Sequence, residues 1–145
     1  MKYSLANYIV SIEPNDATIK SMFGVISIGG EGSAVGSISA SLTNDMWSTE
    51  SFNTGAWVHN KNMSRTGTVS INLSQVSKEV SKFIKMCKLF YAGDYDGFTI
   101  SISDISGMKV CTAVDAYIQK IPNQEFGNTA ANQSWSFACG QLSFA

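Results

Sequence analysis

Residues 68–73 read Thr-Val-Ser-Ile-Asn-Leu, so polar and apolar side chains alternate without a break. Successive side chains of a β-strand point to opposite faces of its sheet, so this segment predicts a strand with one buried face and one wet face. The same alternation recurs at Ser37–Leu42, Phe98–Ser103 and Ser134–Phe137. Shorter runs predict further strands at Tyr8–Ile12, Val25–Ile28, Ala56–His59, Val110–Ile118 and Gln141–Phe144.

One segment, Val76–Tyr91, departs from this alternation because its apolar residues recur at helical spacing. The predicted apolar stripe consists of Val76, Val80, Phe83, Ile84 and Cys87. The opposite side of the predicted helix carries Lys78, Lys82, Lys85 and Lys88. Ser74 or Ser77 can serve as the N-cap, and Gly93 follows the C-terminal end. The expected fold is therefore mainly β (α+β), with one amphipathic helix lying against the sheet.

Three segments between these elements predict turns or loops. Asp104–Gly107 is a natural hairpin connection, and Gly29–Ser33 is a flexible connector. Thr43–Ser64 is too long for a simple turn. Its aromatic residues are Trp47, Phe52 and Trp57. Long loops on small domains are often functional, so we expect this one to be an arm that contacts another subunit; the alternative is a loop folded back over its own core.

Length and composition predict a single soluble domain over residues 1–145, with 44% hydrophobic residues. No apolar run approaches the roughly 18 residues needed to cross a bilayer, and the N-terminus lacks a secretory pattern, so no membrane binding is expected. The net charge of −1 creates no strong field toward nucleic acid. Ser, Thr and Asn number 40, nearly twice the 21 charged residues, which favours a surface that becomes hidden in an assembly.

The sequence offers little for catalysis, and we expect neither an enzyme nor a cofactor. Cys87, Cys111 and Cys139 are widely spaced, so free thiols in or near the core are expected rather than a metal site. His59 is the only histidine, and no triad partner stands at a telling position. Asp94–Gly97 begins like a calcium loop but lacks the later ligands, so a turn is expected there. The glycines match no phosphate-binding pattern.

Three segments of the C-terminal half form a spaced pattern: Ala116–Pro122, Glu125–Gly127 and Asn132–Gly140. Its most specific part is Pro122, then Phe126-Gly127, then Trp135-x-Phe137. This pattern resembles the closing signature of the tail-tube subunits of contractile phage tails. The upstream order, in which Asn60–Gly67 feeds a strand followed by a Ser-initiated helix, is similar as well. The resemblance spans most of the chain and carries no catalytic residues.

The resemblance implies a tail-tube fold: a small β-barrel or sandwich of two packed antiparallel sheets with a flanking helix, related in architecture to type VI secretion tube proteins. It implies hexameric rings that stack into a tube, whose lumen holds the tape measure protein and conducts DNA. The implied partners are further copies of the chain, the tail sheath, a baseplate or tube initiator, a tail terminator, the tape measure protein and passing DNA. The implied location is the virion tail, with assembly in the host cytoplasm.

Two surfaces gain a role from this resemblance. Short hydroxyl side chains suit a lumen wall, because they give DNA no cationic grip; ordinary solvated sheet faces are the alternative. The candidate lumen residues are Ser37, Ser39, Ser41, Thr68, Ser70, Thr99, Ser101 and Ser103. The four helix lysines are candidates for contact with an acidic sheath surface, the alternative being a solvated helix face.

Other functions stay open at this stage. A ring-forming tube of a non-contractile tail or of a secretion-type injection machine would have similar sequence features. A ligand-binding β-sandwich would use the three tryptophans and the many asparagines as a binding surface. It would be a stable monomer, whereas a tube subunit would self-associate.

Overall fold

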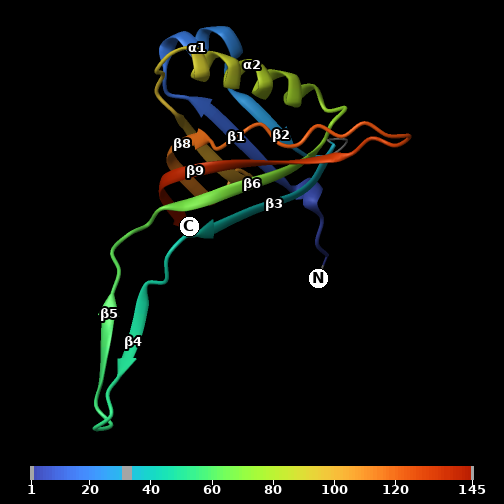
Figure 1. The fold of residues 1–145 in the computed structure, drawn as a ribbon. Coiled ribbons are helices and arrows are strands. Elements are labelled where there is room, and N and C mark those ends of the chain that lie inside the picture. The colour runs from blue at the N-terminus through green and yellow to red at the C-terminus, as the bar shows by residue number, and fades with distance from the viewer. Residues whose placement is uncertain (1, 31–33, 145) are drawn as a thin grey trace.

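The computed structural model describes residues 2–30 and 34–144; Glu31, Gly32 and Ser33 of the expected connector lie outside these residues. The described chain contains one seven-stranded antiparallel sheet in the order β2-β1-β7-β8-β9-β6-β3, together with a β4–β5 hairpin (Figure 1). The strands are β1 (Tyr8–Pro14), β2 (Ile26–Gly29), β3 (Val35–Leu42), β4 (Trp47–Ser51), β5 (Trp57–Lys61), β6 (Gly67–Ser74), β7 (Phe98–Asp104), β8 (Lys109–Ile118) and β9 (Asn132–Phe144). The helices are α1 (Ala17–Phe23), α2 (Lys78–Ala92) and a short 3₁₀ turn, η1 (Leu5–Asn7).

The seven-stranded sheet buries one face and leaves the other open. In β6 the apolar residues Val69, Ile71 and Leu73 are buried, and the residues between them are half-exposed. The neighbouring strand β9 places Phe137 opposite Val69 and Trp135 opposite Ile71, both fully buried. The alternation of the sequence therefore becomes a dry core face and a wet outer face, as predicted for this strand.

Helix α2 closes the core on the buried face of the sheet (Figure 1). Its buried residues are Val80, Phe83, Met86 and Cys87. The Phe83 ring lies 5.3 Å from the Trp135 ring and 5.8 Å from the Phe137 ring, measured between centroids. Such tilted and edge-on aromatic contacts add to the free energy gained by burial. The predicted amphipathic helix is therefore confirmed.

The start of α2 differs from the prediction. Val76 does not belong to the apolar stripe: it precedes the helix and its side chain is 74% exposed. Ser77 is the N-cap residue, with extended backbone angles. Its hydroxyl bonds to the Glu79 carboxylate at 2.5 Å instead of capping a backbone N–H. At the other end, Gly93 follows the helix as predicted, and its N–H donates to the Leu89 carbonyl.

Helix α1 was not expected from the sequence. It spans seven residues and buries only Ile19, so it has too few turns to display a helical stripe. Its start is fixed by Asp16, whose carboxylate accepts a hydrogen bond from the Thr18 N–H at 2.9 Å. An Asp at this position satisfies one of the free N–H groups of the first turn.

Strand β9 is continuous, whereas the sequence predicted two strands, Ser134–Phe137 and Gln141–Phe144. Cys139 and Leu142 are both buried although three positions separate them, so the alternation changes phase between them. The adjoining strand β8 has an irregularity at the same level, where Asp115 takes a φ of 55°. The β8–β9 register is the same on both sides of this point, with Val114 opposite Gln141 and Ala116 opposite Cys139, so the two predicted runs belong to one strand.

The fold class is confirmed as mainly β with a flanking helix. Seven strands share one curled sheet, and the second sheet is the small β4–β5 hairpin. The predicted turn at Asp104–Gly107 is present: the Asp104 carboxylate accepts hydrogen bonds from the N–H groups of Ser106 and Met108, and Gly107 takes a φ of 91°. All three cysteines are free and buried, as predicted. Within the described residues, the helices are too short or too polar to span a bilayer.

Candidate functional site

The predicted hydroxyl residues gather on the outer face of the seven-stranded sheet. In the β3–β6 pair, Ser39 stands opposite Ser70 and Ser41 opposite Thr68. In β7, Thr99, Ser101 and Ser103 are half-exposed and alternate with buried residues. The alternation places all eight candidates opposite the core face, on three strands that are far apart in the sequence. The structure thus brings the predicted residues together on one surface, which we call the polar face.

The register adds further residues to the polar face that the sequence analysis did not assign to it. Ser101 pairs with Ser11 of β1, and Ser11 pairs with Ser27 of β2. Ser70 pairs with Ser136 of β9, and their hydroxyl oxygens lie 3.2 Å apart. The added hydroxyl residues are Ser11, Ser27, Thr112, Ser134, Ser136 and Ser143. The sequence pattern around Ser134 could have identified two of them, but the others require knowledge of strand pairing.

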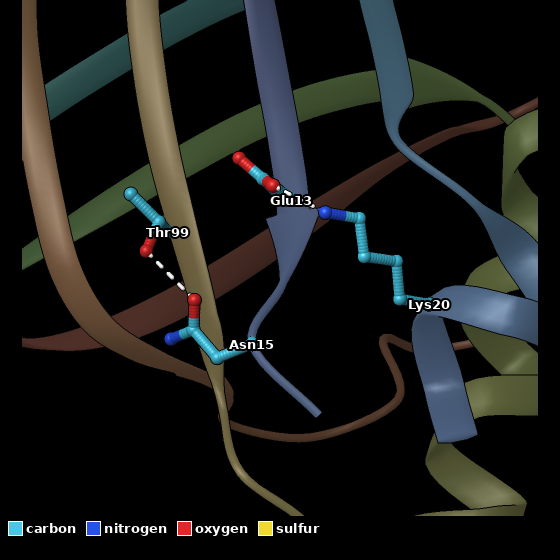
Figure 2. A network of polar contacts seen from close by, with 4 residues as sticks. All are labelled: Glu13, Asn15, Lys20 and Thr99. Carbon is cyan, nitrogen blue, oxygen red and sulfur yellow. Dashed lines mark hydrogen bonds and ion pairs between the residues drawn. The ribbon is translucent and has the colours of Figure 1, made fainter. Parts of the chain in front are cut away.

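Where β1 pairs with β7, the one acidic residue of β1 on the polar face is paired with a cation. Glu13 stands opposite Thr99 in the register, and the Lys20 ammonium of α1 lies 2.7 Å from the Glu13 carboxylate (Figure 2). The hydrogen bond from Lys20 and its positive charge lower the pKa of Glu13. The Thr99 hydroxyl donates to the Asn15 side-chain oxygen at 2.9 Å (Figure 2). A carboxylate on this surface is thereby matched by a cation, and a hydroxyl is held by a neutral amide.

The sheet ends in two open edges. Among the described residues, β2 pairs only with β1, and β3 pairs only with β6. The free side of each strand presents backbone N–H and C=O groups that a further strand can bind. β3 is eight residues long; Val35, Ile38 and Ala40 are partly buried against the core, and its other residues are exposed. An edge of this length is an unusual feature in a protein that stays monomeric.

The segment Thr43–Ser64 forms a hairpin that projects from the sheet, with β4 paired to β5 (Figure 1). We call β4, β5 and their connection the arm. The alternative of a loop folded back over its own core does not hold, because every residue of both strands is exposed. Trp47 is 53% exposed, Phe52 52% and Trp57 67%. The structure therefore leaves all three predicted aromatic residues uncovered, and strand β4 is an element that the sequence analysis missed.

Two local contacts stiffen the arm. The Thr49 hydroxyl lies 2.8 Å from His59 Nδ1 across the hairpin. The Lys61 ammonium lies over the Trp47 ring, 5.6 Å from its centroid, in a cation–π contact. Glycine at position 55 allows the tight connection, because its φ of 88° is unfavourable for other residues. The only histidine of the chain thus has a cross-strand partner on the arm.

The lysines of α2 lie on the side of the helix away from the core. Lys78, Lys85 and Lys88 are exposed, and Lys82 is half-exposed. None of the four forms an ion pair in the described part of the chain. This surface offers four positive charges to a partner.

The groups with possible chemistry lie apart from one another. Residues 2–30 and 34–144 bring no three His, Cys, Asp or Glu side chains together in a way that could hold a metal ion. Burial raises the pKa of the Cys87, Cys111 and Cys139 thiols, so the fraction present as reactive thiolate falls. These observations direct attention to the surfaces of the molecule.

The sequence was compared with protein families and with curated proteins. A family model described as the bacteriophage PhiTE tail tube protein matches residues 8–145. No curated protein matches the sequence.

Solved structures with a similar fold include the sheath/tube terminator of an extracellular contractile injection system, PVC, in its extended state (TM-score 0.54, 16% identity, covering 100% of this chain and 97% of that chain). The sheath–tube complex of the same system, in its extended state, is also similar, with a TM-score of 0.52 and 15% identity; the match covers 99% of this chain and 93% of that chain. The tube-terminating cap of the anti-feeding prophage is similar as well, with a TM-score of 0.51 and 12% identity; the match covers 100% of this chain and 93% of that chain. At these identities the likeness concerns the fold.

Proposed function

The chain belongs to the bacteriophage PhiTE tail tube protein family, and from this we propose that it is the structural tube subunit of a contractile phage tail. In this proposal hexameric rings of the chain stack into a hollow tube within the virion tail, after assembly in the host cytoplasm. The lumen holds the tape measure protein and conducts DNA during ejection. The role is structural and involves no catalysis.

The observation that carries this proposal is the polar face together with the two open sheet edges. A tube wall needs one face packed on the subunit core and the other facing a water-filled channel. The paired hydroxyls at Ser39 and Ser70, and at Ser11 and Ser101, supply such a surface. Because DNA binding is driven mainly by cations that neutralise phosphates, a hydroxyl wall lets a polyanion slide without sticking.

The open edges support ring closure. The β2 edge of one copy and the β3 edge of the next are two different surfaces, so pairing them is a head-to-tail contact. Such contacts produce closed rings or open filaments, according to the rotation between copies. Strand addition at an exposed edge supplies main-chain hydrogen bonds to the joint.

The arm and the lysines of α2 provide the remaining contacts of the proposal. Trp47, Phe52 and Trp57 are large apolar side chains left in water, which favours burial against another subunit of the same ring or of the next one. The four lysines of α2 face outward and meet an acidic sheath surface. A baseplate or tube initiator and a tail terminator complete the ends of the tube.

A second candidate function follows from the similar solved structures, which include a tube terminator and a terminating cap. In that case the chain would close the end of a tube in a phage tail or an injection machine. A terminator forms one ring and stops, whereas a tube subunit continues to stack. The length of the assembly therefore separates the two functions.

Size-exclusion chromatography combined with negative-stain electron microscopy of the purified chain tests the proposal. We expect rings and tubes of variable length at high protein concentration. Single rings that never stack would favour the terminator. A chain that remains strictly monomeric, even with its baseplate initiator added, would contradict both and favour a ligand-binding domain.

A further inference from the structure

The segment between β8 and β9, residues 119–131, forms a second projection of the molecule, which we call the Phe126 loop (Figure 1, orange). Its base is anchored: the Gln133 amide donates to the Gln124 side-chain oxygen at 3.1 Å, and the Gln119 N–H donates to the Ser136 carbonyl. Phe126 is 87% exposed, the most of any large apolar residue described. An anchored loop that holds a phenylalanine in water presents a ready contact residue.

A groove at the base of the arm has complementary properties. Its volume is about 400 Å³, enough to admit an aromatic side chain. We call it the arm-base groove, and its principal lining residues are Leu42, Met46, Lys61, Met63, Arg65 and Phe144. Leu42, Met46, Met63 and Phe144 are exposed in the single chain, whereas Leu142, which also lines the groove, is buried. Methionine side chains adapt their shape and make favourable sulfur–aromatic contacts, so the lining suits an aromatic residue.

Charge makes the match specific. The groove is lined by two cations and no acidic residue. Arg65 is the only arginine of the chain and forms no ion pair within the described residues. Glu125, next to Phe126, likewise forms none there. Of the exposed aromatic residues that the structure describes, Phe126 alone has an acidic neighbour in the sequence.

The loop cannot occupy the groove of its own chain. It ends where β9 begins, whereas the groove contains the last three residues of β9, Leu142 to Phe144. A strand of 13 residues spans about 40 Å at the usual rise per residue. Figure 1 places the loop tip beyond one end of β9 and the C-terminal residues of β9 at the other end. The contact must therefore join two copies, head to tail.

We propose that Phe126 of one copy inserts into the arm-base groove of the next, with Glu125 paired to Arg65 of that copy. The inference rests on the proposed tube function and assigns a specific side-chain contact to it. Being heterologous, the contact uses a different surface on each of the two copies, so it can close a ring or extend a stack, according to the rotation between copies.

Charge reversal tests the pairing. We expect Arg65→Glu and Glu125→Arg each to raise the protein concentration needed for assembly by about tenfold or more, since each places like charges together at a contact residue. An equimolar mixture of the two variants restores assembly, because copies can alternate with opposite charges facing. Lys2→Glu is the matched control and leaves self-assembly unchanged, because Lys2 is an exposed lysine that belongs to none of the proposed contact surfaces. Pelleting by ultracentrifugation measures all four samples.

The outcomes separate this contact from the tube function. Suppose that the wild-type chain forms tubes. The contact is then overturned if either single variant assembles as well as the wild type, or if the mixture assembles as poorly as each variant alone. Either result leaves the tube function standing. If the wild-type chain stays monomeric, a second measurement decides: copies carrying Met63→Cys and copies carrying Phe126→Cys are mixed under oxidising conditions. The contact predicts a disulfide-linked heterodimer, more abundant than that from a Met22→Cys and Phe126→Cys mixture. Equal yields would overturn it.

Discussion

At the residue scale, the joint between helix α2 and the sheet depends on one aromatic cluster. Phe83 is fully buried and contacts the rings of Trp135 and Phe137, which belong to β9. We expect Phe83→Ala to lower the free energy of unfolding by about 3–5 kcal/mol, through lost burial and the cavity left behind. Urea unfolding measures this loss. Phe126→Ala is the matched control and should change the stability of the isolated chain by less than about 0.5 kcal/mol.

The turn between β7 and β8 gives a pH-dependent prediction. The hydrogen bond from the Ser106 hydroxyl, assisted by backbone N–H groups, lowers the pKa of Asp104 below its ordinary value of 3.8. A carboxylate with a lowered folded pKa stabilises the fold above its unfolded pKa and loses that effect as the pH falls through the folded value. Asp104→Ala should therefore be less stable than the wild type at neutral pH, and the difference should shrink below pH 3.8.

Urea unfolding of both proteins across this acidic range provides the measurement. Comparing the two chains at each pH removes the titration of the other groups that they share. A difference that stays constant down to the lowest pH would show that the Asp104 carboxylate does not stabilise the turn through its charge.

At the element scale, the arm stands apart from the rest of the fold. Its two strands pair with each other and with no strand of the larger sheet. Deleting residues 47–57 should therefore change the stability of the remaining domain by less than about 1 kcal/mol, within the range of surface changes. The same deletion should abolish tubes in negative-stain images, because the aromatic contacts to other subunits are lost. Intact tubes from the deleted chain would refute the role of the arm.

Helix α2 gives a second prediction at this scale. Replacing Lys78, Lys82, Lys85 and Lys88 with Glu reverses the charge of its outer side and should abolish sheath assembly on the tube, while tubes still form. Co-sedimentation of sheath protein with preformed tubes measures the effect. Lys109→Glu serves as a control, because Lys109 stands opposite Ser103 on the polar face rather than on α2. Unchanged sheath binding by the fourfold variant would show that these lysines contact solvent and not the sheath.

Elements with a buried side were predictable from the sequence, and elements without one were not. Strand β6 follows the alternation of Val69, Ile71 and Leu73 because one of its faces is dry. Strand β4 carries no such signal because all its residues are exposed. Helix α1 is too short for a stripe, and only the cap at Asp16 marks its start. Hydrophobic periodicity records burial within the chain, so exposed elements escape it.

The polar face was also predictable only in part. The hydroxyl alternation at Ser37–Leu42 and Thr68–Leu73 indicated wet sheet faces, and the structure places them on neighbouring strands. Their union with Ser11 and Ser27 depends on β1 pairing with both β7 and β2. Strand order is set by contacts between distant segments, so local patterns do not specify it.

At the scale of the whole molecule, the proposed surfaces point in different directions. The helices cover one side of the sheet, the arm projects from the other, and the Phe126 loop projects along the strands (Figure 1). A chain with this arrangement can contact several neighbours at once and leave most of the polar face uncovered. That face is then left free to line a channel, and the open edges of β2 and β3 are left free to join adjacent copies.

A cryo-electron microscopy reconstruction of assemblies formed by the purified chain tests this arrangement most directly. We expect a hollow tube of stacked hexameric rings in which Ser39, Ser70 and Ser101 face the lumen, β2 and β3 of adjacent copies lie side by side, and α2 lies on the outside. A reconstruction in which the polar face points outward, or in which the helix lysines line the channel, would contradict the proposed tube.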